Sequence, residues 1–335
     1  MLTVLRAYHY APRKAGLLTR AVLPLLDDLR RTDGHDVAFV TRHWDGGSHL
    51  ALHLGPGPVR ADAAALLGER VAALGEPGET WSEAEYAARR REYEAAEERT
   101  ARHASPFAHG TVRMEEAGDP APLEAVRHTM LTGLTRVLAD AAESGPGLVL
   151  QLLLAAGSVF PGGLRFGSLS YRSHAEAYLA ASPHEHPLRE RFEQAYQQRA
   201  EALDQLVADA LATPAALPAY GTFAQAYARL REPDMDGPVR ALLGAADEAA
   251  ALPQPGRMSA FHATLQHSGF HSRPPEGFLP YRVLVNWLYE LLPVLDVTTV
   301  HRYLYCYCTA RAVDERLGEA WQDRLKTRPT RHAPH

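Results

Sequence analysis

The polar residues best placed to do chemistry lie in the segment RMSAFHATLQHSGF, residues 257–270. Ser259, His262 and Gln266 fall three and four residues apart, so in a helix they share one face. Polar helix faces are most often solvated, but this segment lies between a Pro/Gly loop and a strongly apolar helix, which favours an internal position. Buried polar groups need hydrogen-bond partners, and they collect at active sites. The spacing therefore makes this shared face, with His262 on it, a candidate functional site.

A second group of candidates lies in the segment 298–317, which is expected to be a helix. Arg302, Tyr303 and Tyr305 stand beside its apolar stripe. Tyrosine hydroxyls can act as general acids, although aromatic clusters on helices more often only pack in a core. The stripe itself is expected at Val300, Leu304, Tyr307 and Val313.

The segment 165–176 combines arginines with a helix-start pattern. Ser173 and Glu176 form the Ser-x-x-Glu pattern of a capping box, so a helix is predicted to begin there. The pattern leaves His174 unexplained. Arg165 and Arg172, just before that start, are candidates to receive a carboxylate or amide near the helix N-terminus.

The Arg/Glu-rich stretch 89–99 is most simply an exposed helix with ion pairs four residues apart. Its Glu94 and Glu97 can equally point into a cleft, where one of them would supply a carboxylate.

Several familiar sites are excluded. The chain has no phosphate-binding loop, no GxGxxG after its first strand, no GxSxG and no HExxH. His267 and His271 have the spacing of a metal pair, but Gly269 lies between them and two prolines follow. The run 184–186 (His-Glu-His) is a still weaker metal candidate. The sequence therefore indicates neither a cofactor nor a metal.

Composition narrows the classes of protein further. The chain has 335 residues, 46% of them hydrophobic, enough for a core in one large domain or two closely packed ones. A net charge of −5 gives no general attraction to nucleic acid. Of the 35 basic residues only Lys14 and Lys326 are lysine. This excess of arginine fits codon bias first, although arginine also holds carboxylates bidentately and would suit an acidic peptide partner.

No segment looks like a targeting signal or a membrane span. The start MLTVLRAYHY lacks the shape of a signal peptide, and the apolar runs 148–160 and 283–297 are interrupted by polar residues. A cytoplasmic protein is expected. Cys306 and Cys308 lie two residues apart in a helical pattern, so they face different ways and are expected to be core residues rather than a disulfide or zinc site.

The order of elements predicts an α+β fold. A part rich in strands, about residues 1–118, precedes a helical part, about 119–325, in a single catalytic domain with a flexible tail at 326–335. The predicted strands are 3–10, 37–43, 49–54 and 109–116. The predicted helices are one between the loops at 55–58 and 75–78, and 16–31, 82–102, 123–143, 147–156, 173–181, 187–211, 223–231, 238–250, 258–268, 280–292 and 298–317.

Four segments, in this order and spacing, resemble one known family. They are TRHWDGGSHLALHL (41–54), SYRSHAEAYL (170–179), RMSAFHATLQHSGF (257–270) and NWLYELLPVLDVTTVHRYLYCYC (286–308). Together they are similar to the C-terminal domain of lanthipeptide dehydratases and to its stand-alone relatives that build the pyridine ring of thiopeptide antibiotics. The similarity covers most of the chain and is strongest at 38–54, 167–179, 257–270 and 281–321.

One departure from the family bears on activity. In lanthipeptide dehydratases this domain removes glutamate from glutamylated Ser/Thr, and its histidine helix reads His-x-x-x-Asn-Arg. The matching positions here are His262, Gln266 and His267, so the histidine is kept while Asn and Arg are replaced. A neutral histidine holds a departing glutamate less well than arginine. The departure favours the pyridine synthases over the elimination lyases.

The resemblance to pyridine synthases implies a formal [4+2] aza-cycloaddition between two dehydroalanines of one peptide. Loss of water and of the leader peptide as an amide then yields the aromatic ring and the macrocycle. The implied partner is a precursor peptide whose leader is acidic and helical, with other pathway enzymes as further partners and no cofactor, nucleic acid or membrane. His262 would be the central acid/base, with the remaining roles assigned from motif neighbourhood alone: Tyr303 or Tyr305 as proton donor, Ser259 or Ser268 on the reacting amide, Glu94 or Glu97 as second carboxylate, and Arg42, Arg165, Ser173, His174, Gln266, His267 and Arg302 in substrate binding.

Two alternatives remain open. The first is a stand-alone lyase that eliminates glutamate beside a separate glutamylating partner. The second is a leader-binding scaffold without catalytic activity, which would tolerate replacement of His262.

Overall fold

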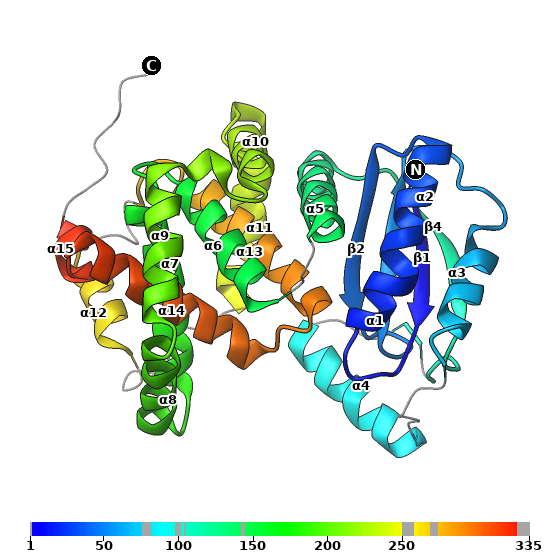
Figure 1. The fold of residues 1–335 in the computed structure, drawn as a ribbon, viewed down its shortest axis with the longest axis horizontal. Coiled ribbons are helices and arrows are strands. Elements are labelled where there is room, and N and C mark those ends of the chain that lie inside the picture. The colour runs from blue at the N-terminus through cyan, green and yellow to red at the C-terminus, as the bar shows by residue number, and fades with distance from the viewer. Residues whose placement is uncertain are drawn as a thin grey trace. The chain divides into compact units, whose positions relative to one another are not determined.

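The computed structural model describes residues 2–75, 82–97, 102–103, 105–141, 145–249, 258–268 and 274–326. The chain forms two compact units (Figure 1). Unit 1 contains residues 1–141 and 288–297, and unit 2 contains residues 142–287 and 298–335. Helices and one small antiparallel sheet make up the described residues, which confirms the predicted α+β class. No helix among the described residues has the length and apolar character needed to cross a membrane.

Unit 1 is built on a four-stranded antiparallel sheet in the order β2-β3-β1-β4. The strands are β1 (Leu2–Tyr8), β2 (Val37–His43), β3 (His49–Gly55) and β4 (Val112–Ala117). The β2–β3 hairpin closes as predicted, with His43 opposite His49 across the turn. That turn needs glycine at Gly46 and Gly47, because both have positive φ and a Cβ on Gly47 would lie 2.5 Å from the Tyr10 hydroxyl.

The described residues of unit 1 before residue 141 form six helical segments. They are α1 (Ala15–Leu17), the π-helical turn η1 (Leu18–Val22), α2 (Leu23–Asp33), α3 (Ala63–Ala72), α4 (Glu83–Glu97) and α5 (Pro122–Asp140). The predicted capping box of α4 is confirmed, because Glu85 accepts from the Ser82 backbone N–H (2.8 Å) and donates its own N–H to Ser82 Oγ (3.3 Å). Helix α5 runs along β2, where Thr132 and Thr135 Oγ1 accept the backbone N–H groups of Ala38 (3.1 Å) and Val40 (3.3 Å).

Buried histidines make unit 1 sensitive to acid. Burial is the main cause that lowers the pKa of His9 to about 4 and of His49 to about 3. His49 is held neutral, since its Nε2 lies 3.2 Å from the Arg6 guanidinium, which can only donate, and its Nδ1 then donates to the Gly47 carbonyl (2.8 Å).

We expect the free energy of unfolding to fall as the pH is lowered from about 6.5 towards 4, by up to about 1.4 kcal/mol per pH unit for each such histidine. The unfolded chain takes up these protons near pH 6.5 while the folded chain does not. Urea denaturation at pH 7, 6 and 5 checks this above the range in which ordinary carboxyl groups titrate. His49→Gln should make the pH dependence shallower, and an unfolding free energy equal at pH 7 and pH 5 would contradict the prediction.

Unit 2 is helical throughout its described residues. Helices α7 (Leu164–Ala181) and α14 (Thr299–Leu317) pack against each other at its centre. Around them stand α6 (Pro146–Ser158), α8 (Glu185–Gln197), α9 (Ala200–Ala212), α10 (Tyr220–Leu230), α11 (Asp236–Ala249), α12 (Ala260–His267), α13 (Phe278–Leu291) and α15 (Trp321–Lys326), with short 3-10 turns at 214–216 and 233–235. The last turn of α13 and the 3-10 turn at 292–295 that follows it belong to unit 1. Both cysteines are free and buried, as predicted.

Three local predictions for this unit were wrong. Helix α7 begins at Leu164, directly after two glycines with positive φ, so Ser173 lies inside the helix and is not its N-cap. The predicted helix 187–211 is two helices, α8 and α9, which separate near Arg199. Both pack on α14, but α8 also packs on α7 whereas α9 also packs on α6. Val300 has an exposed fraction of 42% and does not belong to the core stripe, because it lies in the first turn of α14.

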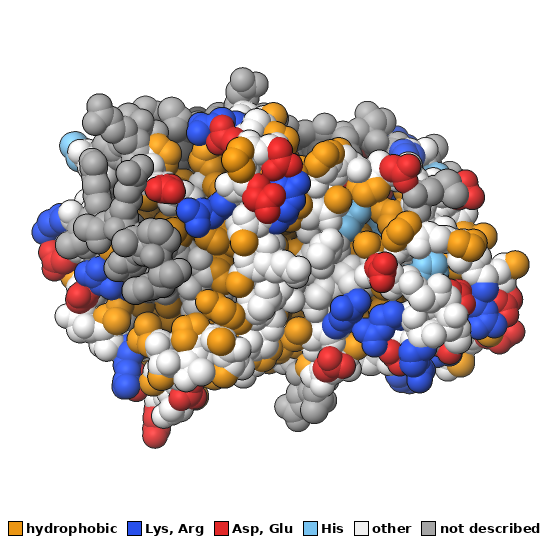
Figure 2. Space-filling view, turned by 90° about the horizontal axis from the view of Figure 1, so that it is seen from above, with side chains coloured by type: hydrophobic (Ala, Val, Ile, Leu, Met, Phe, Trp, Pro, Cys, Tyr) orange, Lys and Arg blue, Asp and Glu red, His pale blue; other side chains and the backbone are white. Residues whose placement is uncertain are grey.

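Charges are mixed on the face of the molecule drawn in Figure 2. Basic side chains lie there in small groups with acidic side chains beside them, rather than in one continuous basic stripe. This distribution, with the net charge of −5, gives that face no electrostatic footprint for nucleic acid.

Candidate functional site

The centre of the candidate site is a histidine held between two serine hydroxyls. His262 Nδ1 lies 2.8 Å from Ser259 Oγ, and His262 Nε2 lies 3.0 Å from Ser173 Oγ. Ser259 is the N-cap of α12, and its Oγ also accepts the backbone N–H of His262 (3.3 Å). Ser173 comes from the middle of α7. The sequence predicted the closeness of Ser259 and His262, and the structure adds Ser173 at the other ring nitrogen.

The two hydroxyls allow the imidazole to pass a proton across its ring. When the Ser259 hydroxyl donates to Nδ1, the N–H at Nε2 donates to Ser173 Oγ, and the opposite arrangement is equally permitted. The ring can then accept a proton at one nitrogen and release one at the other. Geometry of this kind suits a step in which one group gains a proton while its neighbour loses one.

Local packing fixes the position of this histidine. Phe261 and Leu265 on α12 are buried, and the Phe261 ring lies 5.1 Å from the Trp321 ring of α15. Helix α12 also packs on α7, which carries Ser173. Ser259 itself is 8% exposed and His262 is half-buried, so the predicted internal position is confirmed for Ser259, whereas Met258 and Ala260 on either side of it are exposed.

A pocket gives access to this end of α12. It has a volume of about 490 Å³ and is lined by the α7–α8 connection, including Ser182 and the 184–186 run, and by Met258 and Ser259. The His-Glu-His run therefore lines the pocket that reaches Ser259. Among the described residues, no group of three or more His, Cys, Asp or Glu side chains is arranged to hold a metal ion.

A cationic and aromatic cluster neighbours the histidine. Burial first, and then the positive charges of Arg302, Arg282 and His262, lower the pKa of His174 to about 4, so His174 is neutral at neutral pH. Arg302 donates to the Tyr303 hydroxyl (2.9 Å) and its guanidinium lies 4.6 Å from the centre of that ring. The structure thus brings His174, Arg302 and Tyr303 into one cluster, while their roles in substrate binding and proton donation stay predictions.

Tyr303 and Tyr305 play different structural parts. The Tyr303 ring stacks on Tyr178 of α7 with ring centres 4.2 Å apart. Tyr305 lies two positions further along α14 and therefore faces another way. Burial raises its pKa, and the centre of its ring lies 6.4 Å from that of His301. Of the two proton-donor candidates, Tyr303 is the one that shares the cluster with Arg302.

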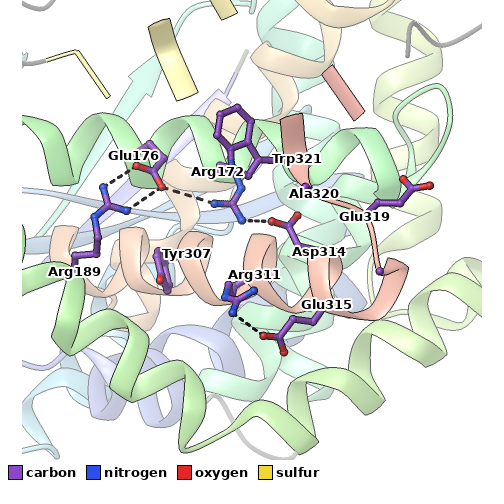
Figure 3. A pocket seen from close by; sticks show the side chains of 11 residues that line it. Arg172, Glu176, Arg189, Tyr307, Arg311, Asp314, Glu315, Glu319, Ala320 and Trp321 are labelled. Atoms are coloured by element: carbon purple, nitrogen blue, oxygen red, sulfur yellow. Dashed lines mark hydrogen bonds and ion pairs between the residues drawn. The ribbon is translucent and has the colours of Figure 1, made fainter. Parts of the chain in front are cut away.

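A second pocket, of about 430 Å³, is lined by ion pairs between α7, α8, α14 and α15 (Figure 3). Asp314 accepts from both Arg172 and Arg324, and all three side chains are buried. Burial lowers the pKa of Arg172 and lowers that of Arg324 to about 10, which still leaves Arg324 charged at neutral pH. Glu176, one turn after Arg172 on α7, lies 3.7 Å from Arg172 and 2.8 Å from Arg189, and so links these two arginines (Figure 3).

This pocket corrects the reading of the arginines near Ser173. Arg172 does not stand before a helix start but inside α7, where it is paired with Asp314. Arg165 lies in the first turn of α7 and donates to Glu319 (2.7 Å). Sequence reasoning missed Asp314, Arg324 and Arg189, because their partners lie many residues away and leave no local spacing signal.

The C-terminal end of α12 differs from its start. Gln266, His267 and Ser268 are exposed, His267 Nδ1 contacts the Ala263 carbonyl (2.6 Å), and the Ser268 hydroxyl donates to the Leu265 carbonyl (2.7 Å). The prediction of an internal face was therefore wrong for Gln266, since α12 is only eight residues long and its last turn reaches solvent. Their assigned roles in catalysis and binding remain predictions.

The remaining candidates belong to unit 1. Arg42 donates to Asp296 (2.9 Å) and to the Pro293 carbonyl (3.0 Å). Glu94 pairs with Arg90 at 3.8 Å, four residues earlier on α4. The Glu97 side chain lies outside the part that the structure describes. The substrate and carboxylate roles of these residues stay predictions.

Comparison with known proteins gives one family and several structures of similar fold. A family model described as "Lantibiotic biosynthesis dehydratase C-term" matches residues 3–313. A structure titled "Pyridine synthase, TbtD, from thiomuracin biosynthesis" aligns with a TM-score of 0.69 and 19% identity, over 95% of this chain and 99% of that one. The "Crystal structure of TsrL" aligns with a TM-score of 0.62 and 18% identity, over 100% of this chain and 99% of that one. No curated protein matches this chain.

Proposed function

Because this chain belongs to the lantibiotic biosynthesis dehydratase C-terminal family, we propose that it is an enzyme of modified-peptide biosynthesis that acts as a thiopeptide pyridine synthase. It would join two dehydroalanines of one precursor peptide by a formal [4+2] aza-cycloaddition. Water and the leader peptide, as a carboxamide, would then leave to give the aromatic ring. The fold shared with TbtD over nearly the full length of both chains supports this proposal.

The single observation that carries the proposal is the Ser173–His262–Ser259 chain of hydrogen bonds. Cycloaddition requires one backbone amide to become an imidic acid, so its nitrogen loses a proton while its oxygen gains one. An imidazole bracketed by two hydroxyls can carry out both transfers without a cofactor. The 490 Å³ pocket at Ser259 is where the reacting amide would meet the chain of hydrogen bonds.

The later steps need the same kind of group. Loss of water requires a proton donor at the departing hydroxyl, and expulsion of the leader requires a base on the ring carbon. Tyr303, held by Arg302, would assist as donor while His262 takes the ring proton. The larger contribution comes from holding two distant residues of a flexible peptide in contact, which can lower a barrier by about 7–11 kcal/mol.

One observation favours a second candidate, glutamate elimination from a glutamylated serine or threonine. Three guanidinium groups, those of Arg172, Arg189 and Arg311, line the 430 Å³ pocket, and Arg172 directly precedes Ser173. Arg172 Nε is buried without a hydrogen-bond partner among the described residues, so donor capacity remains for a carboxylate. The exposed His267, in place of the family's arginine, weighs against this candidate.

Mass spectrometry of the full-length protein with two peptides separates the candidates. One peptide carries a leader, azoles and two dehydroalanines, and the other carries a leader and a glutamylated serine. We expect the first to become a macrocycle that has lost water and the leader carboxamide, with a new pyridine absorbance. Loss of glutamate from the second peptide alone would identify an elimination lyase. Leader binding without reaction of either peptide would leave the scaffold as the function.

A further inference from the structure

The two edge strands of the sheet in unit 1 differ in whether their outward backbone groups have hydrogen-bond partners. At β2, the threonine hydroxyls of α5 accept outward backbone N–H groups and close the edge. At β4, the other edge, no hydrogen bond from the described residues reaches the outward backbone groups. An open edge strand is a template for pairing with another strand. The open edge of β4 is therefore a candidate site for pairing with a further strand.

The outward groups of β4 follow from its pairing with β1. Gly110, at φ +78°, donates to the Tyr8 carbonyl (2.9 Å), and Tyr8 donates to the Thr111 carbonyl (3.0 Å), which forms a bulge just before the strand. Since antiparallel partners alternate, Arg113 and Glu115 exchange hydrogen bonds with β1. Val112, Met114 and Glu116 then turn their N–H and C=O groups to the free edge.

The side chains of β4 are self-complementary about Met114. Met114 is 49% exposed, a large exposed fraction for an apolar side chain in the described part of the chain. Arg113 and Glu115 carry opposite charges on either side of it. Glu115 is 3.3 Å from Arg6, 3.7 Å from Arg102 and 3.9 Å from Arg113, so Arg6 and Arg102 can hold this carboxylate without Arg113. The Arg113 guanidinium lies 4.5 Å from the centre of the Phe107 ring and would turn from there to another carboxylate.

We propose that β4 pairs with β4 of a second copy of this chain, antiparallel, with Met114 opposite Met114 of the partner subunit. Both outward groups of Met114 then hydrogen-bond across the two-fold axis. Arg113 faces Glu115 of the partner subunit at a position where opposed side chains come closest, and the symmetry makes this pair twice. The two sheets become one continuous sheet.

Neighbouring registers are less favourable. Centring the pair on Val112 would bring the Gly110 bulge into the ladder, where regular pairing stops. Centring it on Glu116 would oppose two Glu116 carboxylates, and like charges directly opposite are destabilising. Of these three registers, only the one centred on Met114 avoids the bulge and the repulsion between carboxylates. It also places residues whose N–H and C=O groups point to the free edge opposite each other, as hydrogen bonding requires.

Sedimentation velocity of the full-length protein, from low to high micromolar concentration, tests the pairing. We expect a dimer that becomes monomeric in Met114→Pro, because proline removes an N–H that the edge needs but the subunit's own sheet does not use. Met114→Thr keeps that N–H and should remain dimeric. Unchanged far-ultraviolet circular dichroism in both variants shows that the subunit still folds.

A charge-reversal pair sharpens the test. Arg113→Glu alone and Glu115→Arg alone each oppose like charges and should raise the dimer dissociation constant about tenfold or more, whereas their equimolar mixture restores both pairs and should form heterodimers. A wild-type monomer at every concentration, or a dimer in Met114→Pro as stable as wild type, would overturn the proposal. Amides of 112, 114 and 116 that become protected from exchange by substrate peptide, and not by rising protein concentration, would assign the edge to the peptide instead.

Discussion

Replacing His262 with glutamine is expected to lower the turnover number for ring formation by about 10²–10⁴-fold, the range that acid/base catalysis contributes. Glutamine fills a similar space and still forms hydrogen bonds, but its amide does not titrate near neutral pH and cannot relay a proton between Ser259 and Ser173. Single-turnover conversion of the dehydroalanine peptide, followed by mass spectrometry, measures the loss. Leader affinity, measured separately by fluorescence anisotropy, should change little.

The chain offers a closely matched control in His301. Thr298 caps α14 as Ser259 caps α12, with the His301 N–H 3.3 Å and the His301 Nδ1 3.2 Å from the Thr298 hydroxyl. His301 is exposed, and within the described part of the chain its hydrogen bonds go to Thr298, with no serine hydroxyl at its Nε2. His301→Gln should therefore leave turnover within a factor of about two. Equal losses of turnover in the two variants would mean that the effect comes from helix capping rather than from proton transfer. Full activity of His262→Gln would contradict the proposed acid/base role of His262.

Replacing Asp314 with asparagine is expected to lower the free energy of unfolding by about 3–5 kcal/mol, because it removes the one carboxylate that Arg172 and Arg324 share. Both guanidinium groups are buried, so neither can recover its hydration without local opening. The triad ties α7, α14 and α15 together, and Trp321 on α15 supports Phe261 beside His262. Urea denaturation monitored by tryptophan fluorescence measures the change.

Glu319→Gln supplies the comparison. Glu319 and Arg165 form a close ion pair, 2.7 Å apart, but the Glu319 side chain is 40% exposed and the Arg165 side chain 33% exposed. Water already solvates both charges there, so the loss should stay below about 1 kcal/mol. A smaller loss in Asp314→Asn than in Glu319→Gln would mean that the buried triad is not what holds α15 in place.

Much of the fold could be predicted from local patterns. The strand 37–43 was placed residue for residue, because alternation and the Asp-Gly-Gly turn fix the hairpin within a short stretch. The start of α7 was not, because a Ser-x-x-Glu pattern inside a helix looks the same as one at its start. The break between α8 and α9 has no glycine or proline to announce it and depends on how each helix packs. The spacing of residues within a short segment does not predict how that segment packs against distant parts of the chain.

The candidate site divides along the same line. Ser259 and His262 were predicted because capping geometry and helical spacing act over three residues. Ser173 is a candidate from its Ser-x-x-Glu pattern and not from any sign of contact with His262, which lies 89 residues further along the chain. Gln266 has the spacing that places it on the same helix face as Ser259 and His262. It is nevertheless exposed, because α12 is short and Gln266 lies in its last turn.

The segment 288–297 has a consequence for how such a protein can change over evolutionary time. It belongs to unit 1, although the chain before and after it belongs to unit 2. Its Asp296 accepts the backbone N–H groups of Lys14 and Ala15 (2.8 and 3.0 Å) as well as the Arg42 guanidinium. A gene fragment ending at residue 141 would therefore encode a sheet without the carboxylate that anchors its first helix. The two units are not exchangeable modules, and recombination that shuffles whole domains would have to carry both together.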